Sequence, residues 1–150
     1  MQSWVDTTVA KNNTWLVLVI HGVDGLGYEA LPHTLLDTYF QYIKAREDKL
    51  WVATFGDVTK YMRERESVKV TGHYHPENGK ILITIDNPLD AAVYNIPLTL
   101  KTYVTSGLKK VSVKAGKQLK TLSTLVDENG TYVLFQTLPG KAVIVEENRL

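Results

Sequence analysis

Trp15-Leu-Val-Leu-Val-Ile-His21-Gly22 is the stretch that decides how the first part of the chain is interpreted. Residues 15–20 are an unbroken apolar run rich in β-branched side chains, which is typical of a strand buried on both faces of a parallel sheet. The glycines at 22, 25 and 27 then predict a loop. His21 is therefore expected at the end of a buried strand, where α/β folds collect their active-site groups.

The residues that follow continue an α/β pattern. An amphipathic helix is expected over 34–48, a second short apolar strand over 50–55, and a second helix over 57–66. The segment 6–14 has a weak apolar side and could end an earlier helix. Residues 1–66 are thus predicted to be an α/β fragment with parallel βαβα order.

Beyond Ser67 the pattern changes to short, mostly alternating strands separated by turn signals such as Asn-Gly and Pro-Gly. We expect a small antiparallel β-sandwich of about six to eight strands, with the domain boundary at Glu66. The expected strands cover residues 68–72, 80–85, 98–104, 110–114, 131–135 and 142–145.

The first domain raises a problem of completeness. Two buried parallel strands in a piece of this size cannot build a sheet that is covered on both faces. Either the missing neighbours come from another copy of the chain, which would make a homo-oligomer through these strands, or the chain is a fragment of a longer protein. The sequence leaves both explanations open.

Composition excludes several classes of protein. The chain has 150 residues, of which 44% are hydrophobic and 22% charged, and its net charge is +1. This balance favours neither a nucleic-acid binder nor a membrane-surface protein. The absence of cysteine excludes disulfides, thiolate metal sites and cysteine nucleophiles. The longest apolar run, 15–20, is too short to span a bilayer.

The pattern of residues 15–22, 36–43 and 50–61 resembles the C-terminal part of the polysaccharide deacetylase family, also called the NodB-homology family or family 4 of the carbohydrate esterases. The resemblance implies the end of a deacetylase-type barrel followed by a β-rich tail. In that family an apolar strand ends in a His that acts with a metal-bound water to remove acetyl groups from polysaccharide. His21 stands in that position.

The resemblance also implies a divalent, zinc-like metal, whose ligands this sequence lacks. The family takes them from an Asp-Asp motif and a His-x-x-x-His motif, both upstream of the His strand, and the segment 54–57 has the wrong residue order for the first of these. The chain is therefore expected to hold the acid side of the site without the metal side. The parent protein is expected to be extracellular or periplasmic.

His21 and Asp24 are the candidate catalytic residues. A His can protonate the leaving oxygen or nitrogen in acyl hydrolysis, and a nearby carboxylate such as Asp24 can orient its ring. The structural alternatives are a His that caps a strand end and an Asp that shapes a turn. Tyr28 and His33 are the candidate substrate-binding residues at the rim, although His33 could serve only to begin a helix.

The second domain has weaker candidates. His73 and His75 alternate along a strand and could share a metal, but a third ligand is not evident, and exposed strand histidines explain them as well. The lysines near 110–120 suit a solvated sheet edge. A sugar-stacking platform could be formed by Tyr74, Tyr94, Tyr103 and Tyr132. The alternative function is accordingly a non-catalytic module that binds carbohydrate or supports the catalytic domain.

Overall fold

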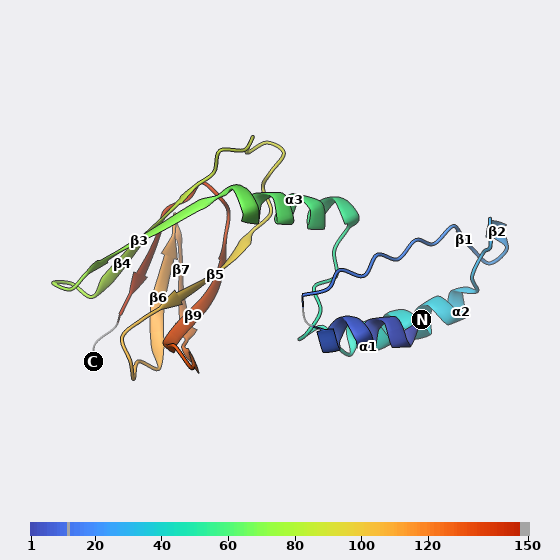
Figure 1. Ribbon diagram of the computed structural model, residues 1–150, viewed down its shortest axis with the longest axis horizontal. Helices are drawn as coiled ribbons and strands as arrows, with labels where there is room; N and C mark the ends of the chain where they lie inside the picture. Colours follow the sequence, from blue (N-terminus) through green and yellow to red (C-terminus); the bar gives the residue numbers. More distant parts are fainter. Residues whose placement is uncertain (12, 148–150) are drawn as a thin grey trace. The chain divides into compact units, whose positions relative to one another are not determined.

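The computed structural model describes residues 1–11 and 13–147. The chain is a mixed α/β protein that divides into two compact units, Met1–Phe55 and Gly56–Leu150. The division falls before the helix that was expected to end the first domain, so this helix belongs to the second unit. Each unit is described separately below (Figure 1).

The first unit consists of two helices and a small hairpin. Its elements are α1 (Gln2–Lys11), β1 (Gly22–Val23), β2 (Leu26–Gly27) and α2 (His33–Lys44). Val5 from α1 and Leu36 and Tyr39 from α2 are its buried apolar side chains. The amphipathic helix predicted over 34–48 is confirmed, with an earlier end.

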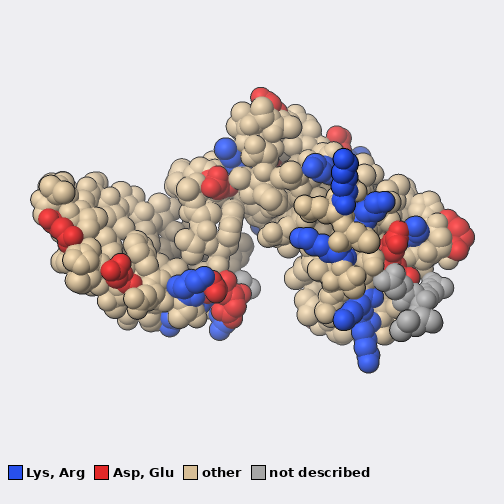
Figure 2. Space-filling model, turned by 180° about the vertical axis from the view of Figure 1, so that it is seen from behind, with Lys and Arg blue, Asp and Glu red and all other residues tan. Residues whose placement is uncertain are grey.

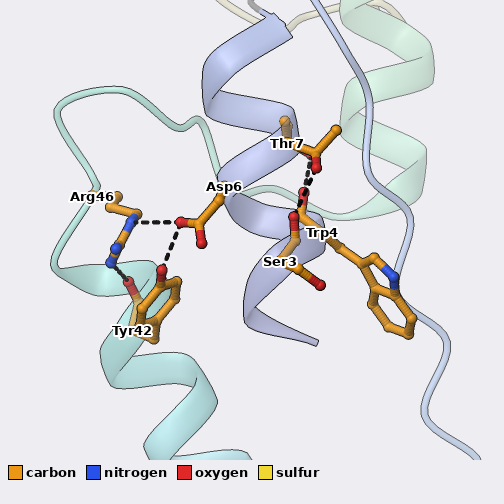
Figure 3. Close-up of polar contacts among 7 residues, drawn as sticks. Ser3, Trp4, Asp6, Thr7, Tyr42 and Arg46 are labelled. Atoms are coloured by element: carbon orange, nitrogen blue, oxygen red, sulfur yellow. Dashed lines mark hydrogen bonds and ion pairs between the residues drawn. The ribbon is translucent and has the colours of Figure 1, made fainter.

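A polar cluster attaches α1 to α2 (Figure 3). The Tyr42 hydroxyl donates to Asp6 Oδ1 at 2.6 Å, and Arg46 Nε lies 3.5 Å from the same oxygen. The Arg46 guanidinium also covers the Tyr42 ring, at 3.5 Å from its centroid, and donates to the Tyr42 carbonyl at 2.9 Å. The hydrogen bond to Asp6 raises the pKa of Tyr42. These contacts fix the two helices side by side.

The structure does not confirm the parallel sheet expected in the first unit. Residues 15–20 and 50–54 belong to no helix or strand, and Val19 and Val52 are 73% and 71% exposed. Apart from the antiparallel β1–β2 pair, this unit contributes one parallel bridge, between Val23 and Leu31. A buried parallel strand needs neighbouring strands on both edges and cover on both faces. The 55 residues of this unit do not supply them, so the two apolar segments do not pair as strands.

The second unit contains α3 (Phe55–Ser67) from its second residue onward, and its described residues continue with eight strands in two antiparallel sheets (Figure 1). The five-stranded sheet has the order β3-β4-β10-β6-β7 and the three-stranded sheet the order β5-β9-β8. Their bounds are β3 (Lys69–His75), β4 (Lys80–Asp86), β5 (Leu98–Tyr103), β6 (Lys110–Ala115), β7 (Gln118–Ser123), β8 (Leu125–Asp127), β9 (Gly130–Thr137) and β10 (Val143–Glu146).

One apolar core joins the two sheets. Alternate residues of β4, β6 and β10 pack with Val133 and Phe135 of β9 in a single buried cluster. Alternation of buried and exposed residues along β4 and β9 follows the period of two that the sequence showed. The six predicted strands of this unit are confirmed, and β7 and β8 are additional. None of the helices in the described part of the chain is long and apolar enough to cross a bilayer.

Glu64 is a buried carboxylate on α3, whereas Met62 of the same helix is exposed. Its Oε1 accepts a hydrogen bond from the Ile96 backbone N–H at 3.1 Å, whereas its Oε2 is buried without a hydrogen-bond partner in the described residues. Burial raises the pKa of Glu64, and the Ile96 N–H and Lys60 only partly oppose this shift.

We expect Glu64 to make the second unit less stable as the pH rises. A carboxyl whose pKa is raised by folding stabilises the fold fully below its ordinary pKa of 4.5, and this contribution is lost as the pH rises through the folded pKa. Glu64→Gln should therefore flatten the dependence of unfolding free energy on pH above the ordinary carboxyl pKa of 4.5, measured by urea unfolding. Glu66→Gln, at an exposed position of the same helix, should leave the slope unchanged.

Candidate functional site

A tight hairpin follows His21 and shapes the candidate site. Asp24 and Gly25 occupy its two-residue turn with φ of 53° and 81°. Two successive positive φ values are the mark of a type I′ turn, for which Asp-Gly is a favoured dipeptide. The turn lets Gly22 pair with Gly27 and Val23 with Leu26.

The hairpin can form only because the first pair of residues across its two strands, Gly22 and Gly27, has no side chains. A Cβ on Gly22 would lie 1.9 Å from the Leu26 carbonyl oxygen, and one on Gly27 would lie 2.6 Å from the His21 carbonyl oxygen. Gly27 also has a φ of 94°, which other residues rarely adopt. The glycines thus fix the backbone directly after His21.

His21 lies exposed at the base of this hairpin. The Tyr28 ring meets the His21 ring edge to face, with centroids 5.9 Å apart and an interplanar angle of 86°. Within the described residues, no hydrogen bond engages the imidazole. Tyr28 is itself 71% exposed, so the two rings together present an open surface.

Asp24 pairs with His33 and does not orient His21 as the sequence had suggested. Its carboxylate oxygens lie 2.9 and 3.1 Å from His33 Nδ1, and Oδ1 also accepts from the His33 backbone N–H at 2.9 Å. His33 is the first residue of α2, so Asp24 satisfies one of the open N–H groups at the helix start. Because a carboxylate only accepts, His33 Nδ1 carries the proton in this contact.

The backbone strengthens this connection between hairpin and helix. The Asp24 N–H donates to the Leu31 carbonyl at 3.1 Å, and the Leu31 N–H donates to the Gly22 carbonyl at 3.0 Å. The four candidate residues therefore form two pairs on one loop: His21 with Tyr28, and Asp24 with His33. The Asp24–His33 pair was missed, although Asp-Gly between apolar residues is a signal for a hairpin whose turn can reach the next helix.

No group of three or more His, Asp or Glu side chains with metal-binding geometry occurs in residues 1–11 and 13–147. In the second unit, His75 at the end of the exposed strand β3 has its Nδ1 3.1 Å from Glu77 Oε1. No step is therefore assigned to a metal.

Comparisons with protein-family models, with curated proteins and with solved structures found no match to this chain.

Proposed function

We propose that this chain supplies the general acid of a carbohydrate esterase or deacetylase that removes acetyl groups from polysaccharide, and that His21 is this acid. The observation that carries the proposal is the exposed His21 ring, with no hydrogen bond to it in the described part of the chain, at the base of a hairpin that two glycines fix. A catalytic imidazole needs both an accessible nitrogen and a defined position.

The chemistry assigned to His21 is proton donation to the leaving group. When water adds to the acetyl carbon, the resulting tetrahedral intermediate breaks its bond to the sugar oxygen. That oxygen would leave as a poor alkoxide unless it gains a proton at the same time. Protonated His21 donates this proton, and the products are acetate and the free sugar hydroxyl.

Tyr28 and His33 are assigned to the rim of the site. The Tyr28 edge-to-face contact limits rotation of the His21 ring, and its exposed side chain can pack against a sugar. The second ring nitrogen of His33, Nε2, is assigned a hydrogen bond with a substrate hydroxyl, which can both donate and accept. Asp24 holds His33 in this orientation.

The parallel barrel implied by the family resemblance is also part of the proposal. Residues 15–20 are apolar, lie in no helix or strand, and have exposed or half-buried side chains, which is the condition expected of a central strand without its neighbours. We propose that further polypeptide, either from a longer natural chain or from a second copy, pairs with them and completes both the sheet and the site.

Loss of His21 should abolish most of the activity. In the natural polypeptide that contains this sequence, His21→Ala is expected to lower acetate release from acetylated xylo-oligosaccharides about 10²- to 10⁴-fold, the usual contribution of a general acid. His73→Ala is the matched control, since His73 is an exposed histidine on β3 in the other unit. Equal rates for the His21 variant and the wild type would contradict the proposal.

A further inference from the structure

The outer face of the three-stranded sheet carries a cluster that the proposed function does not use. Along β5 and β9 the residues that face away from the core lie opposite one another, with Lys101 paired to Leu134 and Tyr103 to Tyr132. Strand β8 adds Leu125 beside Tyr132. Side chains from three strands thus meet on one exposed surface.

The polar members of the cluster hold one another in place. Lys101 Nζ forms an ion pair with Asp127 and lies 4.2 Å from the centroid of the Tyr132 ring. The Tyr103 hydroxyl donates to Asp127 Oδ2 at 3.1 Å. The two tyrosine rings meet at 64° with centroids 6.0 Å apart. The Lys101 ammonium thus lies over both rings, at 4.2 Å from the Tyr132 centroid and 5.1 Å from the Tyr103 centroid, and Tyr103 is the more exposed of the two tyrosines.

The turn between β8 and β9 fixes Asp127 independently of the cluster. Asp127 Oδ1 accepts hydrogen bonds from the backbone N–H groups of Asn129 at 2.9 Å and Gly130 at 3.1 Å. A side chain anchored in this way loses little further freedom when a ligand binds, so the cluster is preorganised.

The cluster combines exposed apolar surface with a neutral pair of charges. Tyr103, Leu125 and Leu134 are 43%, 47% and 43% exposed. The contact between Lys101 and Asp127, with a further contribution from Tyr103, raises the pKa of Lys101 and lowers the pKa of Asp127. Both side chains therefore stay charged near neutral pH, and their opposite charges cancel. Around this cluster the second unit carries both charge signs, and on the face that Figure 2 shows Lys and Arg cover more of its surface than Asp and Glu.

We propose that Tyr103, Leu134 and Leu125, together with the Lys101–Asp127 pair, form a binding site for an uncharged polysaccharide chain. An exposed tyrosine ring and adjacent leucines match the apolar face of a pyranose. The ammonium and the carboxylate at the ring edge match neighbouring sugar hydroxyls, which can both accept and donate hydrogen bonds. Zero net charge at the cluster disfavours nucleic acid and anionic membrane, which require excess positive charge.

This inference goes beyond the proposed function because it involves neither His21 nor the first unit. It predicts that the chain is retained by insoluble polysaccharide even when it cannot release acetate. The opposite result, turnover of soluble substrate without retention, would leave the His21 proposal intact and overturn this one.

The test is depletion of the whole 150-residue chain from solution by unacetylated xylan, cellulose and mannan, each used separately. The wild type is expected to bind at least one of them, and Tyr103→Ala should weaken that binding about tenfold, equivalent to the loss of about 1.4 kcal/mol. Val70→Ala, which shortens a similarly exposed apolar side chain on β3 of the other sheet, is the matched control. Thermal unfolding of each variant checks that the fold is retained.

A second measurement does not depend on the stability of any variant. Soluble xylo-, cello- and manno-oligosaccharides are titrated into the wild-type chain, and backbone amide shifts are followed by NMR. Shifts confined to β5, β8 and β9 support the site. The inference is overturned if none of the three polysaccharides binds, if Tyr103→Ala binds as well as the wild type, or if only RNA or anionic vesicles bind.

Discussion

Glu147→Ala is expected to lower the unfolding free energy of the second unit by about 3 kcal/mol or more, since each hydrogen bond to a buried charged group contributes about 1.5–3 kcal/mol. Glu147 is buried directly after β10. Its carboxylate accepts from the Thr105 backbone N–H at 2.6 Å, the Thr105 hydroxyl at 2.7 Å and the Tyr74 hydroxyl at 3.2 Å. These groups follow β5 and lie on β3, so one side chain connects both sheets.

The neighbouring residue gives the control for this prediction. Glu146 pairs with Lys80 at 2.8 Å, but both side chains are partly exposed, and such a pair contributes about 0–1 kcal/mol. Urea unfolding should therefore separate Glu147→Ala clearly from Glu146→Ala. Glu147→Gln, which keeps an acceptor for the Thr105 N–H, should fall between them. Equal midpoints for both alanine variants would show that Glu147 does not connect the sheets.

Gly22→Ala is expected to reduce acetate release about 10²-fold without unfolding the second unit. The added Cβ would lie 1.9 Å from the Leu26 carbonyl oxygen, a backbone atom, so the hairpin must open or shift. A displacement of about 1 Å at a reacting group is enough to cost about 10²-fold in rate. Because His21 precedes this glycine, the shift moves the proposed acid directly.

Gly25→Ala separates steric overlap from turn preference. Gly25 has a φ of 81°, but a Cβ there would meet nothing within 4 Å. This variant bears only the cost of a left-handed conformation, about 1 kcal/mol, and should keep most of the activity. If the Gly25 variant lost as much activity as the Gly22 variant, the close approach of the hairpin strands would not be the cause.

The positions of strands were predicted best where apolar and polar residues alternate along the sequence. Strands such as β4 and β9 have one face in the core, and the period of two revealed them. β7 was missed because it has no buried residue: it lies at the edge of its sheet and carries Lys120 and other polar residues. β8 has only three residues, too few to show a period.

The errors in the first unit and in α3 have different physical causes. Residues 15–20 have the composition of a central strand, but strand formation depends on partners, and composition cannot show whether they are present. Glu64 could not be predicted as buried, because charged residues are almost always placed in solvent. The pairing of Asp24 with His33 depends on a turn that brings residues nine apart into contact.

The most direct test of the account is the effect of the leaving group on the His21→Ala variant, measured in the natural polypeptide. The leaving group of an acetylated xylo-oligosaccharide is a sugar alkoxide, which is a poor leaving group unless it gains a proton. The leaving group of 4-nitrophenyl acetate is a stable phenolate, which needs no proton. If His21 is the general acid, the variant should lose about 10²- to 10⁴-fold in kcat/KM on the sugar ester and much less on the aryl ester. Equal losses on the two substrates would contradict the role of His21 as the acid.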